Sequence, residues 1–212
     1  MIYENSPGLR LDEEHRYWVG DREIWGVSAV MADNRLVDAK WFDESSRSRG
    51  TAIHAELANI ARGAEPFSFL DPDLVGWVKS GIDFLSMLRA DGAEILGVEV
   101  MRHNALYDIA GTIDLVVRWN GSVWIFDHKS GKAARTTRFQ AGAYDMILGP
   151  TEDGKPRRRA AVELQEDGGT AKIVGYNTVE HFHDANRFLG YLNTSRDRKA
   201  YGPKERLTDS MT

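Results

Sequence analysis

The segment AGTIDLVVRWNGSVWIFDHKSG, residues 110–131, constrains the fold more than any other part of the chain. Asn120 and Gly121 stand between two apolar runs, and this dipeptide is the strongest short signal for a two-residue β-hairpin. A type I′ turn there pairs Trp119 with Ser122, and each step outward on one strand is matched by one step on the other. The sequence therefore predicts antiparallel strands at about 107–118 and 122–129.

The same register brings two aspartates together. It places Asp114 opposite Asp127, with Cβ atoms ~4.5–5.5 Å apart. Two carboxylates within apolar strands repel each other and lose hydration, which a divalent cation would most simply compensate. Lys129 follows Asp127 by two residues and so projects from the same face. The alternative, ordinary polar residues at strand ends, stays open because a bulge in either strand would break the register.

Periodicity predicts the other elements. Apolar residues at helical spacing predict helices at about 46–62, 72–90, 136–148 and 179–194. Further strands are expected at about 16–20, 23–30, 94–102, 160–165 and 171–177. We expect Phe182 to be buried in the last helix and the tail beyond Arg196 to fray. This order of elements indicates an α/β fold with a central mixed β-sheet flanked by helices.

The composition limits the chemistry. The chain has 212 residues and no cysteine, which excludes disulfides, thiolate zinc sites, iron–sulfur clusters and cysteine nucleophiles. Any metal must therefore be held by oxygen and imidazole. The net charge of -5 argues mildly against coating of nucleic acid through bulk positive charge. No apolar run is long enough for a membrane span and no leader pattern opens the chain, so we expect a cytoplasmic protein.

Five short motifs follow one another between residues 49 and 144. They are RGTAIH at 49–54, VE at 98–99, GTID at 111–114, DHKSG at 127–131 and QAGAY at 140–144. In type, spacing and order they resemble the PD-(D/E)xK nuclease superfamily, and within it the RecB-like and phage-type exonucleases. The resemblance implies a restriction-endonuclease-like core in a bacterial or phage-infected cell. We expect a single nuclease domain, 1–212, with a strand-rich elaboration (1–48), a catalytic core (49–177) and a C-terminal helix and tail (178–212).

The resemblance also implies roles for individual residues. The metal ligands would be His54, Asp114, Asp127, the main-chain carbonyl of His128 and, for a second metal, Glu99. Among the catalytic residues, Lys129 would orient or deprotonate the attacking water. Gln140 and Tyr144 match a Q-x-x-x-Y motif whose spacing puts both on one helix face.

Each of these roles has a plainer alternative. A histidine on an apolar helix face is often a packed core residue, Glu99 could instead pair with Arg102, and Tyr144 could simply fill the core. The remaining histidines, His15, His103, His181 and His183, are expected at the surface.

The implied cofactor is Mg²⁺, with Mn²⁺ able to substitute, because carboxylate, carbonyl and imidazole donors suit these ions. The implied reaction is phosphodiester hydrolysis in DNA, from DNA ends, in recombination, repair or phage DNA metabolism. A sequence- or structure-specific endonuclease of the same fold and a non-catalytic DNA-binding subunit stay open, as do a homo-oligomer and a recombination partner protein. Phosphate contacts are expected from Arg49, Lys132, Arg135 and Arg138, and from a second basic run at 155–159.

Overall fold

A computed structural model describes residues 2–37, 44–65 and 71–202 of the chain. Within these residues a mixed sheet of eight strands is flanked by five α-helices, which confirms the expected fold class. The strands are β1 (Leu9–Leu11), β2 (Tyr17–Val19), β3 (Arg22–Gly26), β4 (Glu94–Asn104), β5 (Ile109–Trp119), β6 (Ser122–Lys129), β7 (Arg158–Glu163) and β8 (Lys172–Tyr176). Neighbouring strands run in the order β1-β2-β3-β5-β6-β7-β8, and β4 pairs with β5.

The hairpin predicted at Asn120-Gly121 is confirmed. Both residues have positive φ, 49° and 70°, as a type I′ turn requires. Trp119 pairs with Ser122, and the expected register continues as far as Leu115 opposite Phe126. The pairing of β5 with β6 ends there, one step before the two aspartates would face each other.

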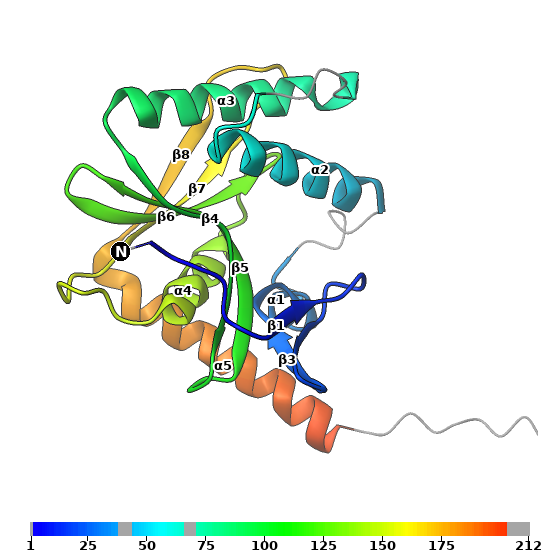
Figure 1. The fold of residues 1–212 in the computed structure, drawn as a ribbon. Coiled ribbons are helices and arrows are strands. Elements are labelled where there is room, and N and C mark those ends of the chain that lie inside the picture. The colour runs from blue at the N-terminus through cyan, green and yellow to red at the C-terminus, as the bar shows by residue number, and fades with distance from the viewer. Residues whose placement is uncertain (1, 38–43, 66–70, 203–212) are drawn as a thin grey trace, which may run out of the picture.

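β5 and β6 separate because another strand, β3, pairs with the same edge of β5. Its other edge is taken by β4 from Arg118 down to Ile109. The start of β5, at Ile109 and Ala110, pairs in parallel with β3. The sheet therefore forks along β5, with β3 on one side of the fork and β6 on the other, and the stretch from Gly111 to Asp114 lies between them (Figure 1).

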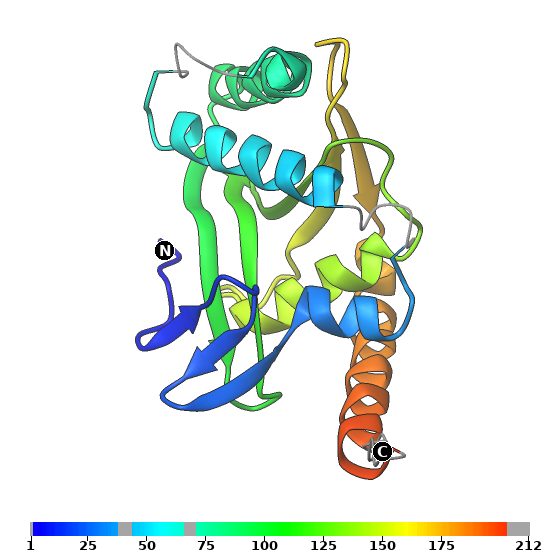
Figure 2. The same ribbon diagram turned by 90° about the vertical axis from the view of Figure 1, so that its right-hand side faces the viewer.

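Helices cover both faces of this sheet. On one face lie α2 (Glu44–Ala61) and α3 (Val75–Ala90), the latter preceded by the 3-10 turn η2 (Pro72–Leu74), and their apolar residues pack on the middle of the sheet in a core with Leu115 and Phe126. On the other face lie α1 (Val27–Asp33), α4 (Thr137–Leu148) and α5 (His181–Tyr201), which follows the turn η3 (Thr178–Glu180) (Figures 1 and 2). The two cores contain different buried residues of β5, Ile109, Ile113 and Val116 in one and Leu115 and Val117 in the other, which is why β5 is almost wholly buried.

The N-terminal region differs from the sequence prediction. The strand expected at 23–30 is β3 followed directly by the short helix α1, and β1 was not anticipated. The β-branched residues Val27 and Val30 suggested a strand, but both side chains are buried at helical spacing in the core around α4. Tertiary packing therefore decides the conformation of this segment.

The last helix also departs from expectation. It continues to Tyr201 rather than fraying after Arg196; the remainder of the expected tail, 203–212, lies outside the described residues. Phe182, expected in the core, is 78% exposed. The buried face of α5 instead contains Asp184, Ala185, Phe188 and Leu192, and Phe182 projects away from it.

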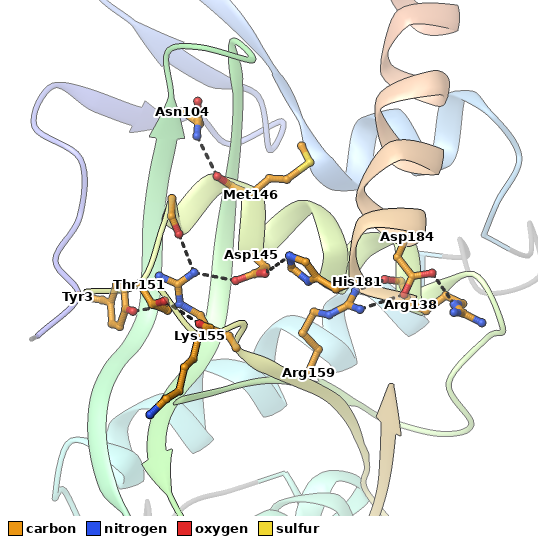
Figure 3. A network of polar contacts seen from close by, with 12 residues as sticks. Tyr3, Asn104, Arg138, Asp145, Met146, Thr151, Lys155, Arg159, His181 and Asp184 are labelled. Carbon is orange, nitrogen blue, oxygen red and sulfur yellow. Dashed lines mark hydrogen bonds and ion pairs between the residues drawn. The ribbon is translucent and has the colours of Figure 1, made fainter. Parts of the chain in front are cut away.

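Buried ion pairs join α4, β7 and α5. Asp184, fully buried, lies between Arg159 on β7, at 3.0 Å, and Arg138 on α4, at 2.6 Å (Figure 3). Asp145 similarly lies between Arg157, at 2.7 Å, and His181, at 2.9 Å. These carboxylates neutralise the arginines in the interior, so the pairs fix how α5 docks on the sheet.

Candidate active site

The fork in the sheet opens into a cavity of about 650 Å³. Asp114 on β5 and Asp127 on β6 line this cavity and are only 6% and 2% exposed. The structure therefore brings the two predicted aspartates to one site, although through the separation of their strands rather than through direct pairing. Asp114 Oδ2 accepts a hydrogen bond from the backbone N–H of His128 at 2.7 Å.

Two histidines surround Asp114. His54 comes from α2, where Ile53 and Leu57 anchor the helix in the core. Its Nδ1 lies 3.5 Å from Asp114 Oδ2, and its Nε2 lies 3.1 Å from the carbonyl oxygen of His128. The His128 ring is buried among apolar groups, edge-on to Phe84. His54 therefore faces the aspartate and the carbonyl that were expected to share its metal.

Glu99 on β4 completes an acidic group. The pairs Val98–Leu115 and Val100–Ile113 flank Glu99 and Asp114, and so bring them side by side. Glu99 has φ of 49°, an unusual value for a glutamate within a strand. His54, Glu99 and Asp114 each offer one ligand atom within 4.8 Å of the others. Ligands on opposite sides of one divalent cation are roughly 4–5 Å apart, so the three residues fit a shared ion.

Lys129 lies at the end of a chain of polar contacts. Its ammonium nitrogen is 2.8 Å from Asp127 Oδ2 and donates to Gln140 Oε1 at 3.2 Å. Gln140 Nε2 in turn donates to the hydroxyl of Tyr144 at 2.8 Å. Gln140 and Tyr144 follow each other by one turn of α4, as their spacing predicted. All four residues line the cavity, and this series of polar contacts fixes the direction of the Lys129 side chain.

Burial and charge shift the pKa values around Asp114. Burial would lower the pKa of His54, but the Asp114 carboxylate outweighs it and raises this pKa to about 9. Burial raises the pKa of Glu99 to about 7, and Asp114 adds to the rise. For Asp114, burial is outweighed by His54, which holds the pKa of Asp114 below its usual range. Burial lowers the pKa of His128 to about 4, so this imidazole is neutral at pH 7.

On β6, burial raises the pKa of Asp127 despite the neighbouring ammonium. Burial would lower the pKa of Lys129, but Asp127 outweighs it and the pKa is raised. Three carboxylates, Glu99, Asp114 and Asp127, thus share a largely buried site with one imidazole and one ammonium. A divalent cation would relieve the repulsion among them.

The basic residues expected at phosphates divide into two groups. Lys132 and Arg135 are exposed in the loop after β6, and Arg49 stacks over Trp77, 5.0 Å from the ring centre, beside the cavity that Lys132 lines. Arg138, by contrast, is held by Asp184 on α5 and by Glu180 in the turn η3. Its guanidinium is therefore already neutralised, and the expected contact of Arg138 with phosphate stays a prediction.

The second basic run, 155–159, contains two buried arginines. Arg157 and Arg159 are 2% and 1% exposed and occupy the interior ion pairs described above, so they are structural. Only Lys155 and Arg158 in this run are exposed. Alternation along a strand could have revealed the inward direction of Arg157 and Arg159.

Two of the histidines expected at the surface have carboxylate partners. His103 Nε2 lies 3.0 Å from Asp108, and His181 contacts Asp145. His183 is exposed, as expected, whereas the exposed His15 lines the cavity.

Sequence reasoning missed other residues of the cavity. The hydroxyl of Tyr17 on β2 forms a hydrogen bond with Thr112 Oγ1 at 2.9 Å, across the fork. Arg62, just after α2, donates to the carbonyl of Val98 at 3.1 Å and also lines the cavity. Thr112 lay within a quoted motif, but no local pattern connects residues 15–17 to β5, which is some hundred positions away.

Comparison with known proteins agrees with this arrangement. The family model described as the PD-(D/E)XK nuclease superfamily matches residues 32–202. The chain belongs to this superfamily, and its class is therefore that of the hydrolytic nucleases. No curated protein matches the chain.

Among solved structures, the chain is similar to one titled "Crystal Structure of LHK-Exo in complex with dAMP". The identity is 14%, the match covers 84% of this chain and 93% of that chain, and the TM-score is 0.31. Within the described residues, no helix has the length and apolar character needed to cross a bilayer.

Proposed function

We propose that the chain is a Mg²⁺-dependent deoxyribonuclease that degrades DNA from its ends, with Mn²⁺ able to replace Mg²⁺. The observation that carries this proposal is the meeting of two groups in one cavity. The cluster of His54, Glu99 and Asp114 lies beside the Asp127–Lys129 ion pair. Oxygen and imidazole ligands next to an ammonium are what hydrolysis of a phosphodiester needs.

The donor set fits a hard divalent cation. Asp114, Glu99 and His54 would hold it together with the carbonyl of His128, and Asp127 would complete the acidic set from the other strand. When bound, such a cation supplies Lewis-acid stabilisation of the charge that develops on the scissile phosphate. Mostly oxygen donors favour Mg²⁺ or Mn²⁺ over Zn²⁺.

The chain's own residues position the reacting groups. Lys129 donates hydrogen bonds to the attacking water and stabilises negative charge on the phosphate. Asp127 and Gln140 hold the ammonium from two sides, and Tyr144 orients the Gln140 amide. Lys132 and Arg135, exposed just after β6, contact backbone phosphates next to the scissile one.

The preference for ends rests on the motifs. The Q-x-x-x-Y pair and the glutamate upstream of GTID resemble those of the phage-type exonucleases. Contacts to phosphates alone tolerate any sequence, which suits a strand moving past one fixed site.

The deciding experiment incubates the protein with linear DNA and with covalently closed circular DNA, in Mg²⁺ or in EDTA. We expect linear DNA, single-stranded or duplex, to be shortened progressively to small 5′-phosphorylated products. Closed circles should survive, and EDTA should stop all cleavage. Discrete fragments from a closed circle would favour an endonuclease instead, and metal-dependent binding without cleavage of any substrate would favour a non-catalytic DNA-binding subunit.

A further inference from the structure

The cavity has two walls from distant parts of the chain. One wall is α2, with Gly50, Thr51 and Ala55 toward the space above Asp114. The opposite wall is the hairpin of β1 and β2, which contributes Leu11, His15 and Tyr17. Figure 2 shows α2 crossing above this N-terminal hairpin. None of the hairpin residues belongs to the five motifs.

The wall formed by α2 includes several small side chains. Gly50, Ala55 and Ala58 recur on one side of the helix, with Asn59 and then Arg62 at its end. Small side chains on this side leave the cavity wide enough for a polymer to run along the helix, whereas Ile53 and Leu57 on the other side hold the helix in the core.

The tip of the hairpin is held by one carboxylate. Asp12 Oδ1 accepts hydrogen bonds from the backbone N–H groups of Glu14 and Arg16, at 3.0 and 2.8 Å. Its Oδ2 accepts from Arg16 Nε and Trp18 Nε1, both at 2.9 Å. These contacts surround His15, which has φ of 60°, a left-handed conformation that is uncommon for residues other than glycine but more frequent for histidine than for most.

The base of the hairpin is also fixed. The hydroxyl of Tyr17 bonds to Thr112, two residues from Asp114 on β5. The hairpin is therefore attached to the floor of the cavity at one end, and its tip holds His15 at the rim. The contacts of Asp12 stay within the hairpin and fix the shape of its tip, while the Tyr17–Thr112 bond joins the hairpin to β5.

We propose that α2 and the β1–β2 hairpin form a slot that admits one DNA strand to the site, and that His15 is a positioning residue for this strand. The inference rests on the proposed nuclease function and specifies its substrate as a single strand or an unpaired end. Asp114 and Asp127 lie at the bottom of the slot, almost without exposure, so a phosphate reaches them only if its own nucleotide enters the cavity.

The dimensions favour a single strand. A volume of about 650 Å³ is that of a small-molecule site, typically ~300–1,000 Å³, and it lies between two walls. A nucleotide in a duplex must leave its stack and its partner before it can enter, which costs free energy. A single strand does not require this step. The imidazole of His15 then donates to a phosphate of the strand, from the wall opposite Arg62.

The test measures cleavage and binding with the wild type, His15→Ala and a matched control, His183→Ala, whose histidine is exposed on α5 away from the cavity. The substrates are a linear single strand, a blunt duplex and a duplex with an unpaired overhang, all of one sequence. Binding of the fluorescently labelled single strand is measured in EDTA, so this readout does not depend on catalysis.

We expect the wild type to cleave the single strand and the overhang at least about tenfold faster than the blunt duplex, because unpairing is avoided. His15→Ala should raise KM and the single-strand Kd about tenfold, the size of one lost hydrogen bond to a charged group, while kcat changes little. His183→Ala should match the wild type.

Equal rates of cleavage of the blunt duplex and the single strand would overturn the proposal that the slot admits one DNA strand. A His15→Ala protein that behaves like His183→Ala would overturn the role of His15. If no substrate is cleaved with either metal, the proposed nuclease function fails, yet the inference is still decided: weaker single-strand binding by His15→Ala in EDTA supports the slot, and unchanged binding overturns it.

Discussion

The carboxylate of Asp114 accepts a hydrogen bond from the backbone N–H of His128, at 2.7 Å, just beyond the point where β5 and β6 stop pairing. The side chain takes the place of a backbone partner that the fork has removed. One oxygen of Asp114 is thus oriented by the same strand that carries Asp127 and Lys129. The two acidic strands of the site are therefore fixed relative to each other before any cation binds.

Asp114→Asn should remove the negative charge and keep an oxygen that can accept from His128. We expect the cleavage rate to fall at least about a hundredfold, since a ligand of the proposed cation is lost. The melting temperature without metal should fall at pH 7, because the lowered pKa of Asp114 shows that His54 stabilises its charged form in the folded protein, and this outweighs the repulsion from Glu99 and Asp127. Release of acid-soluble nucleotides and thermal melts in EDTA measure the two effects. Cleavage of DNA by Asp114→Asn at the wild-type rate would contradict the assignment of Asp114.

His54→Ala distinguishes a ligand from a packed core residue. If His54 is a ligand, its replacement should weaken Mn²⁺ binding by at least about tenfold in calorimetry; the free energy of unfolding should also fall at pH 7, because the raised pKa of His54 shows that its pair with Asp114 stabilises the folded state. A core residue should instead cost about 1–3 kcal/mol in that free energy without altering metal affinity. Calorimetry and urea denaturation of the same preparation separate the two results.

Asp184→Asn should destabilise the protein although the residue lies outside the cavity. The substitution leaves Arg159 buried without its full counter-charge, and breaking a buried pair costs roughly 3–5 kcal/mol. Asp83→Asn is the control, because the exposed pair of Asp83 with Lys79 is worth at most about 1 kcal/mol. Urea denaturation measures both, and equal stabilities of the two variants would refute the structural role of Asp184.

Lys132→Ala and Arg138→Ala should act differently on DNA binding. Lys132 is exposed, so its removal should reduce the slope of log K against log salt by about 0.7–0.9, the value for one phosphate contact. Arg138 is neutralised by Asp184 and Glu180, so its removal should lower the melting temperature and leave the slope unchanged. Titrations of labelled DNA at several salt concentrations provide the comparison; a reduced slope for Arg138→Ala would restore it as a phosphate contact.

Asp12→Asn should show how charge supports the hairpin tip. Backbone hydrogen bonds from the 12–16 turn are the largest cause that lowers the pKa of Asp12 to about 2, from 3.8. A depressed carboxyl pKa stabilises the folded state above the unfolded value and loses this effect as the pH falls through the folded value. Melting temperatures of wild type and variant should therefore differ at pH 7 and converge between pH 3.8 and 2. A difference that persists at pH 2 would show that the charge is not responsible.

Local chemistry made the hairpin of β5 and β6 predictable, and tertiary pairing limited the prediction. Asn120 and Gly121 determine the turn, and the period of two then fixes the register as far as Phe126. The separation beyond Phe126 depends on β3, more than eighty residues earlier in the chain, and no pattern within the hairpin indicates it. The aspartates were nevertheless correctly placed in one cavity, because both strands continue past the fork toward it.

Buried charges account for two further differences. A hydrophobic pattern assigned Phe182 to the core of α5, whereas the helix turns Asp184 inward because Arg159 and Arg138 are there to neutralise it. Arg157 and Arg159 looked like a basic surface for the same reason, since their partners come from α4 and α5. The two partners of such a pair lie in distant elements, so neither segment alone identifies the other partner.

The fork along β5 also affects how the chain avoids association. Ile109 and Ala110 have their backbone groups satisfied by the parallel strand β3 alone on that edge. Without residues 9–26, this short apolar stretch would become an open sheet edge, a template for pairing with a strand of another molecule. The N-terminal segment that forms one wall of the cavity is thus also the cover that keeps the central strand from seeding aggregation.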